Sequence, residues 1–180
     1  MSPDALFRPS APRTPTRAVH LDLKGLPPTP DRLPALLDVL AAGRYNAAVV
    51  EWEDMFPWTV DERFRCETAY TPDDVRAFAV AAAQRGIELI PLVQGLGHMQ
   101  TPLRVAGYER LREVPHSADT LNPLAAGAAQ LVRDMIEDVL ALLPDCRRFH
   151  LGGDEAHSLG SSPAGQAFVA ERGPAALYLH

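Results

Sequence analysis

Four short apolar runs recur along this chain, and longer segments with helical periodicity separate them. The runs cover Ala18–Leu23, Ala47–Glu51, Ile87–Val93 and Arg148–Leu151. They do not alternate apolar with polar residues, which is typical of strands that are buried on both faces. Strands of that kind, joined by helices, form parallel sheets. The sequence therefore predicts an α/β fold with four parallel strands and crossover helices.

The segments between the runs begin with the same sequence pattern, a capping residue followed by proline. Thr or Asn can cap the first free N–H groups of a helix, and Pro tolerates the first helical position because its missing donor would be unpaired there. The three starts are Thr29-Pro30, Thr71-Pro72 and Asn122-Pro123. The expected stops are Gly43, Gly86 and Pro144. Further helices are expected over 162–172 and, shorter, within 102–114.

Composition and charge bear on whether the chain binds nucleic acid or a membrane. The chain has 180 residues with a formal net charge of -6, and no basic stripe accompanies that charge, which argues against a nucleic-acid partner. No apolar run reaches the ~18 residues that span a bilayer, and the N-terminus lacks the apolar core of a secretory signal. We therefore expect no membrane association and a cytoplasmic location.

The cysteines and the N-terminal composition bear on domain organisation. Cys66 and Cys146 are far apart and form no Cys-x-x-Cys pair, so neither a disulfide framework nor a structural zinc site is expected. Residues 1–17 are rich in Pro, Ser, Thr and Arg, which predicts a flexible arm. The folded domain is expected to cover residues 18–180.

The fourth apolar run ends on two glycines and two adjacent carboxylates. Neighbouring side chains on an extended backbone point to opposite sides, so Asp154 and Glu155 can share a site only where the backbone turns. Gly152 and Gly153 permit that turn. Crowding and partial burial can hold one acid protonated while its partner stays ionised. The pair is a candidate for acid/base catalysis, and the alternative is a pair that caps a helix or forms surface ion pairs.

The full string, Phe149-His150-Leu151-Gly152-Gly153-Asp154-Glu155, resembles the catalytic signature of the β-N-acetylhexosaminidases of glycoside hydrolase family 20. Three more segments look like the first strand ends of the hexosaminidase D branch, in the same order: Val19–Gly25, Glu51–Pro57 and Ile90–Met99. Periodicity alone leaves open a doubly wound sheet or part of an eight-stranded barrel, and the resemblance favours the (β/α)8 TIM barrel.

Chain length then sets how much of such a barrel we expect. A complete barrel takes about 250 residues, so residues 18–180 are expected to form the N-terminal half of the catalytic domain. An open half-barrel exposes an unpaired strand edge and an apolar face. The expected consequence is a homodimer or a missing C-terminal half.

The resemblance also implies a mechanism, substrate-assisted retaining hydrolysis of terminal N-acetylgalactosaminides or N-acetylglucosaminides, with a glycan or glycoconjugate as the partner and no cofactor. The substrate's 2-acetamido oxygen attacks the anomeric carbon and forms an oxazolinium ion. Glu155 matches the family's general acid. Asp154 matches the residue that orients the acetamido group and stabilises the positive charge on the ring.

Substrate-binding candidates follow from the same resemblance. His98 matches a family histidine that supports the acid or lines the sugar pocket. Glu53 and Asp54 both lie at the second strand exit, and either carboxylate can take the supporting role.

Three more residues can either bind the sugar or play a structural role: Lys24, Trp52 and Trp58. Lys24 lies where many relatives use Arg to hold sugar hydroxyls, although Lys cannot form Arg's bidentate fork, and the alternative is a solvated charge at the strand end. Trp52 or Trp58 can stack on a sugar or pack in the core.

Two other functions compete with this one. In a metal-dependent hydrolase, the ligands would be His150, Asp154, Glu155 and His157. This cluster lacks the His-Glu-x-x-His arrangement and requires both faces of the strand to converge. In the other alternative, the chain is a non-catalytic half-barrel fragment.

Overall fold

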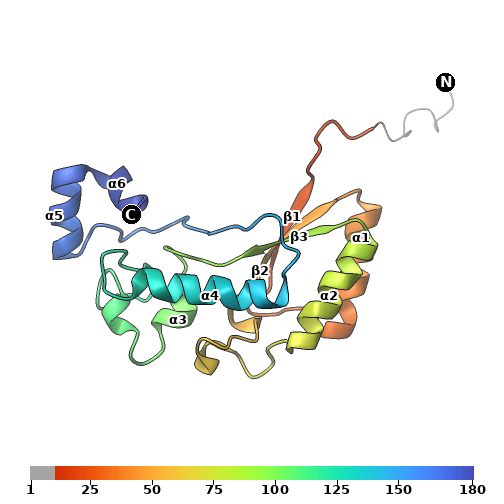
Figure 1. Ribbon diagram of the computed structural model, residues 1–180, viewed down its shortest axis with the longest axis horizontal. Coiled ribbons are helices and arrows are strands. Elements are labelled where there is room, and N and C mark those ends of the chain that lie inside the picture. The colour runs from red at the N-terminus through yellow and green to blue at the C-terminus, as the bar shows by residue number, and fades with distance from the viewer. Residues whose placement is uncertain (1–10) are drawn as a thin grey trace.

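The computed structural model describes residues 11–180 and contains a parallel three-stranded sheet flanked by helices (Figure 1). The strands lie in the order β1-β2-β3, so each is paired with its neighbour in sequence. They are β1 (Ala18–Asp22), β2 (Ala47–Glu51) and β3 (Glu88–Leu92). The first two crossover helices are α1 (Leu33–Ala42) and α2 (Pro72–Gln84). The prediction of parallel strands joined by helices is confirmed for these three strands.

The prediction of a fourth strand over residues 148–151 is wrong, because this segment does not form a full strand. Residues 148–151 form a single parallel bridge, between His150 and Leu92. His150 N–H donates to the carbonyl of Pro91 at 2.9 Å, and its carbonyl accepts from Val93 N–H at 3.1 Å. The segment lies at the edge of the sheet within residues 11–180, and Gly152, with φ of 64°, turns the chain away directly afterwards. The ladder therefore ends after one residue pair.

The capping pairs begin helices in two of three places. Thr71 accepts from Asp74 N–H and completes a capping box at α2. Thr29 precedes a 3-10 turn, Pro30–Arg32, which leads directly into α1. At Asn122 the prediction is wrong, because its side chain accepts from Leu124 N–H at 2.9 Å and closes a turn instead.

The remaining helices cover the second half of the chain. They are α3 (Gln100–Leu103), α4 (Ala128–Leu142), α5 (Pro163–Arg172) and α6 (Pro174–Tyr178). The helix predicted over 162–172 is confirmed, whereas the one within 102–114 is replaced by α3 and a 3-10 turn, Glu109–Leu111. Helices α5 and α6 lie together at one end of the molecule (Figure 1). No helix within residues 11–180 is long and apolar enough to cross a membrane.

The strand register sorts the sheet into two faces. Leu21, Val50 and Pro91 share one face, and Val50 belongs to the core together with Leu37 of α1 and Phe78 of α2. The opposite face, called the inner face here, carries Ala18, His20, Asp22, Ala47, Val49, Glu51, Glu88, Ile90 and Leu92. Its β1 residues are exposed. One side of the sheet is thus packed on helices and the other is partly open.

A flexible arm is predicted over residues 1–17, and the first ten of these lie outside the described part of the chain. Its last residue is fixed to the loop between α1 and β2, because Arg17 N–H donates to Asn46 Oδ1 at 2.8 Å. The boundary at residue 18 stays a prediction.

Candidate active site

Asp154 and Glu155 lie just beyond the extended segment that follows α4, and both carboxylates are exposed. His98, in the loop after β3, contacts them both. Its Nε2 lies 3.3 Å from Glu155 Oε2 and 3.6 Å from Asp154 Oδ2. The structure thus brings together three of the predicted residues, although His98 and Asp154 are 56 positions apart in sequence.

A glycine in the loop after β3 makes this approach possible. A Cβ atom added to Gly97 would lie 2.1 Å from the carbonyl oxygen of Asp154 and 3.0 Å from Ala156 N. Both neighbours are backbone atoms, which cannot rotate out of the way. The backbone of 154–156 therefore packs directly on the loop that presents His98, and only glycine fits between them.

Three residues of the site have backbone conformations that are rare outside glycine. Glu53, His98 and Glu155 have φ angles of 50°, 54° and 50°, and within residues 11–180 the other non-glycine residue with positive φ is Arg44. Such conformations cost on the order of 1–3 kcal/mol each and persist where surrounding contacts hold them. Their concentration here marks the ends of β2, β3 and the 148–151 segment as one specialised region.

Of the two carboxylates after β2, the structure brings Glu53 to this region. Glu53 Oε2 accepts from Thr101 Oγ1 at 2.7 Å, and Lys24 Nζ lies 3.6 Å from its other oxygen. Burial raises the pKa of Glu53 to about 6. Asp54 does not line the cavity beside Glu53, and its Oδ1 is buried without a hydrogen-bond partner.

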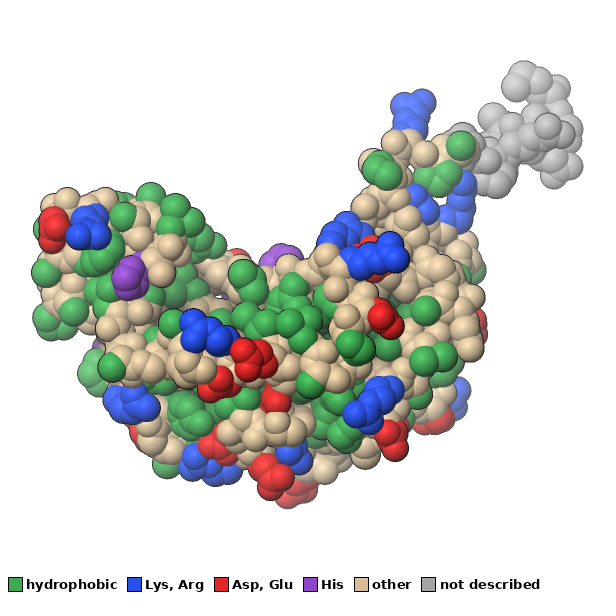
Figure 2. Space-filling view, in the orientation of Figure 1, with side chains coloured by type: hydrophobic (Ala, Val, Ile, Leu, Met, Phe, Trp, Pro, Cys, Tyr) green, Lys and Arg blue, Asp and Glu red, His purple; other side chains and the backbone are tan. Residues whose placement is uncertain are grey.

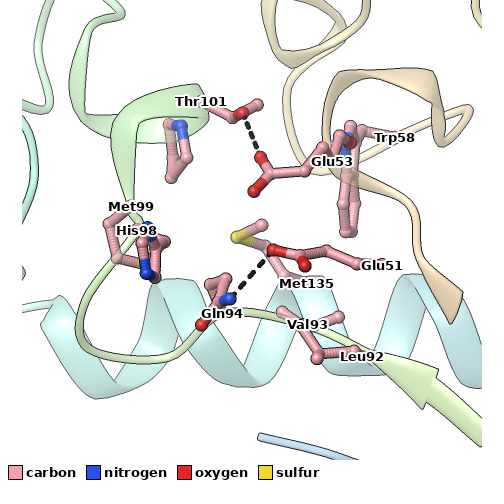
Figure 3. A pocket seen from close by; sticks show the side chains of 11 residues that line it. Glu51, Glu53, Trp58, Leu92, Val93, Gln94, His98, Met99, Thr101 and Met135 are labelled. Carbon is pink, nitrogen blue, oxygen red and sulfur yellow. Dashed lines mark hydrogen bonds between the residues drawn. The ribbon is translucent and has the colours of Figure 1, made fainter. Parts of the chain in front are cut away.

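Glu51, the last residue of β2, is a site residue that the sequence analysis missed. Its side chain is 5% exposed, yet it lies against His20 and Lys24. It also accepts a hydrogen bond from Gln94 (Figure 3). The signal that could have found it is a charged residue that ends an otherwise apolar strand, at the sheet edge where the other candidates gather.

Two cavities adjoin these residues. The smaller, of about 20 Å³, has room for roughly one water molecule and lies among Glu51, Glu53 and His98 (Figure 3). The larger, of about 520 Å³, is open, and its size is within the range of small-molecule sites. It lies on the inner face and is lined by His20, Val49, Leu92, Gln94, His150, Gly152 and Asp154. Figure 2 shows the molecule hollowed between its α5–α6 end and its β1 end.

Lys24 is half exposed at the end of β1, where its Nζ lies 3.0 Å from Asp22 Oδ2. Burial lowers the pKa of Lys24, but the hydrogen bond to Asp22 and the charges of Glu53 and Glu51 outweigh it, so the pKa is raised overall. Lys24 therefore carries its positive charge among three carboxylates.

The two tryptophans have different surroundings. Trp52 is 1% exposed and packs edge-on against Phe56, Tyr70 and Phe78, so it lies in the core and not at either cavity. Of the two interpretations given for Trp52, core packing fits this geometry. The geometry does not support Trp52 as a substrate-binding residue. Trp58 lines the small cavity, where its Nε1 donates to the carbonyl of Glu53 at 2.8 Å.

The four ligands of the metal-dependent alternative do not form a cluster. Across residues 11–180, no group of three or more His, Cys, Asp or Glu side chains is placed to hold a metal ion. His150 Nδ1 instead accepts from Gly152 N–H at 3.0 Å. The geometry gives no support to a site built from His150, Asp154, Glu155 and His157.

Comparisons with known proteins agree with this arrangement. The sequence model described as "Glycosyl hydrolase family 20, catalytic domain" matches residues 15–178. Hexosaminidase D from Homo sapiens is 39% identical over 154 residues, which cover 85% of this chain and 32% of that protein. Hexosaminidase D from Bos taurus is 38% identical over 154 residues, which cover 85% of this chain and 44% of that protein. The chain thus spans less than half the length of either relative.

Solved structures give the same fold. The chitobiase of Flavobacterium johnsoniae superposes with a TM-score of 0.74 at 23% identity, over 89% of this chain and 27% of that one. The GH20 β-N-acetylhexosaminidase from Streptomyces coelicolor superposes with a TM-score of 0.67 at 24% identity, over 90% of this chain and 38% of that one. The described residues therefore form part of a barrel of this type, with three strands and the bridged segment 148–151.

Proposed function

Because the chain belongs to glycosyl hydrolase family 20, we propose that it forms the part of a β-N-acetylhexosaminidase catalytic domain that carries the acid/base carboxylates. One observation carries the proposal: Asp154 and Glu155 adjoin His98, which lies 3.3 Å from Glu155, and Asp154 lines an open cavity of about 520 Å³. The substrates are terminal N-acetylgalactosaminides or N-acetylglucosaminides of a glycan or glycoconjugate, and the proposed compartment is the cytoplasm.

The reaction is retaining and uses the substrate's own nucleophile. The 2-acetamido oxygen forms a bond to the anomeric carbon while the bond to the leaving oxygen breaks, and Glu155 gives its proton to that oxygen. Glu155 then takes a proton from the water that opens the oxazolinium ion, so the enzyme returns to its starting state. Asp154 holds the acetamido group and offsets the positive charge that develops on the ring.

The contacts around the acid fit this division of roles. His98 Nε2 is within 3.6 Å of both carboxylates and can orient them. Glu53 and Lys24 lie on the neighbouring strand ends, where Lys24 can donate to sugar hydroxyls. These groups follow the carboxyl ends of β1, β2 and β3 or of the bridged segment 148–151, and barrels of this class place their catalytic residues at that end of the sheet.

The Glu155→Gln variant tests the proposal by removing the transferable proton while keeping the shape. Aryl N-acetylhexosaminides with poor leaving groups are expected to lose about 10²–10⁴-fold in kcat/KM, and those with good leaving groups much less. Glu171→Gln is the matched control, since Glu171 is an exposed glutamate on α5 that pairs with its neighbour Arg172. Equal losses for all leaving groups would exclude Glu155 as the acid.

A second test addresses the substrate's nucleophile. A thiazoline analogue of N-acetylhexosamine is expected to inhibit competitively, and glycosides without a 2-acetamido group are expected to be almost inert. Asp154→Asn should slow the same step, because an amide cannot offset the developing charge. Efficient hydrolysis of plain galactosides or glucosides would refute substrate assistance.

A further inference from the structure

A buried carboxylate that this mechanism does not use lies at the carboxyl end of β2. Glu51 Oε1 accepts from Gln94 Nε2 at 2.9 Å, and Lys24 Nζ lies 3.7 Å from the same oxygen. His20 Nε2 lies 2.9 Å from Glu51 Oε2. An ionised carboxylate is costly to bury unless it is paired and hydrogen-bonded. These three contacts supply that pairing.

The partners of Glu51 come from both neighbouring strands. His20 lies in β1, Lys24 follows the end of β1 by two residues, and Gln94 follows the end of β3 by two residues. Figure 3 shows Glu51 hydrogen-bonded to Gln94, beside Glu53. One side chain in the middle strand therefore connects all three strand ends.

The Gln94 amide has a fixed orientation and an unused acceptor. A carboxylate only accepts hydrogen bonds, so Gln94 must turn its NH2 group toward Glu51. Its Oε1 atom then points away, and it is buried without a hydrogen-bond partner. Gly152 is close by, because a Cβ atom there would lie 2.0 Å from this oxygen. A buried acceptor left unpaired costs about 1–3 kcal/mol, which a donor on a ligand would offset.

Both residues that Glu51 holds are placed to meet a sugar. Gln94 lines the small cavity and the open cavity alike. Lys24 is half exposed, and of its contacts among the described residues only that with Asp22, at 3.0 Å, is of hydrogen-bond length. Glu53 and Glu51 lie 3.6 Å and 3.7 Å from Nζ. Two of its three N–H donors therefore remain for a ligand. A sugar carries several hydroxyl groups, so one of them can donate to the amide oxygen of Gln94 while another accepts from the ammonium group of Lys24.

We propose that Glu51 is a positioning residue, which holds Lys24 and Gln94 so that the free donors of Lys24 and the free oxygen of Gln94 engage hydroxyl groups of the bound sugar. The inference rests on the proposed function and specifies how that site binds its sugar. Glu51 touches neither the substrate nor the reacting atoms and acts through its two partners.

A second consequence concerns Glu53. Burial raises its pKa, and the neighbouring Glu51 raises it further, while Thr101 and Lys24 lower it. Among the described residues, the titratable groups beside this carboxylate pair are His20 and Lys24, and His98 lines the same small cavity. Asp22 contacts Lys24 in turn. Because Glu51 acts on Glu53 through a hydrogen bond and a charge, its removal is expected to lower the pKa of Glu53. This effect can be measured without any turnover.

The kinetic test is a double-mutant cycle in a complete catalytic domain that contains this chain, with an aryl N-acetylhexosaminide as substrate. Glu51→Gln is expected to raise KM about tenfold with kcat changed less than about threefold, because it loosens binding that ground state and transition state share. Lys24→Met is expected to raise KM similarly. The loss in the double variant should fall short of the product of the two single losses, because Lys24, one of the two residues that Glu51 positions, is then absent while Gln94 remains. Additive effects would overturn the proposal.

The control is Glu113→Gln, which also alters a buried glutamate. Glu113 is 2% exposed and accepts from Ser162 N–H at the start of α5, and its hydrogen bond lies apart from Lys24 and Gln94. It is expected to keep the parent KM. If Glu51→Gln does not fold, Glu51→Asp replaces it, since the shorter side chain withdraws the carboxylate from both partners and should raise KM in the same way.

The second readout is the titration of the Glu53 carboxyl carbon by NMR. The midpoint is expected to be about 6 in the parent chain and lower in Glu51→Gln. An unchanged midpoint would overturn the network. A complete catalytic domain that contains this chain and hydrolyses no N-acetylhexosaminide would refute the proposed function alone, because the NMR titration would still decide whether Glu51 controls its neighbours.

Discussion

Gly97→Ala is expected to disable the site by a purely steric route. The added Cβ atom would lie 2.1 Å from the carbonyl oxygen of Asp154. Reaching an ordinary contact of 3.4 Å requires a separation of about 1.3 Å between two backbones. The segment 154–156 is exposed and attached to the sheet by one bridge, so it is the partner expected to move.

The size of the effect follows from that displacement. Glu155 Oε2 is 3.3 Å from His98 Nε2, and an extra separation of about 1 Å would break this contact. Misplacing a catalytic group by about 1 Å can cost about 10²-fold in rate. Overpacking of this kind typically destabilises a protein by about 1–3 kcal/mol. We therefore expect at least a hundredfold loss of kcat/KM in a variant that still folds.

The assay compares hydrolysis of an aryl N-acetylhexosaminide with urea denaturation for Gly97→Ala and Gly95→Ala. Gly95 is the matched control two residues earlier, where a Cβ atom would lie 3.1 Å from the carbonyl oxygen of Leu151 and the neighbours need yield only a few tenths of an ångström. Gly95→Ala is expected to keep most of its activity. Parent-like activity and stability in Gly97→Ala would show that segment 154–156 does not pack on the loop that carries His98.

Three other predictions follow from the same contacts. The pKa of Glu53 is about 6 in the folded chain against an ordinary 4.5, so between these pH values the folded state keeps a proton that the unfolded state releases. The free energy of unfolding should therefore fall by about 2 kcal/mol as pH rises from 4.5 to 6. Glu53→Gln should flatten this pH profile in urea titrations. Asp138→Ala removes the acceptor for the N–H groups of Thr59 and Val60 and should destabilise the chain by about 1–3 kcal/mol in the same assay, with Asp138→Asn affected less. Expressed by itself, the 180-residue chain should self-associate in light scattering, because the inner face of β1 is exposed. It should also turn over N-acetylgalactosaminides slowly. A monomer with rapid turnover would contradict this prediction.

The fold could be predicted where one physical signal dominates. Residues 47–51 form a strand with the predicted bounds because both faces of that strand are almost fully buried, and an apolar run reports burial directly. The segment 148–151 has a similar run but forms only one bridge, because strand formation there depends on neighbours that the local sequence does not encode. Asn122 failed as a helix start since the same side chain that caps helices also closes turns.

The site divides in the same way. Asp154, Glu155 and His98 could be predicted as candidates because they lie in glycine-containing strings that resemble motifs of the family. Glu51 could not, since a lone glutamate at the end of an apolar run has no signal of its own, and its meaning comes from Lys24 and Gln94 on other strands. For Trp52 the sequence leaves sugar stacking and core packing open, and the structure places its side chain in the core while the neighbouring Glu53 lines the small cavity.

The backbone conformation also matters for the proposed catalytic pair. On an extended strand, Asp154 and Glu155 would point to opposite sides, but Glu155 has φ of 50° and both carboxylates reach His98, which itself has φ of 54°. Local sequence disfavours each of these conformations by on the order of 1–3 kcal/mol. The contact between Gly97 and the 154–156 backbone must therefore supply part of what holds the carboxylates in place, so the geometry of the acid depends on a residue that performs no chemistry.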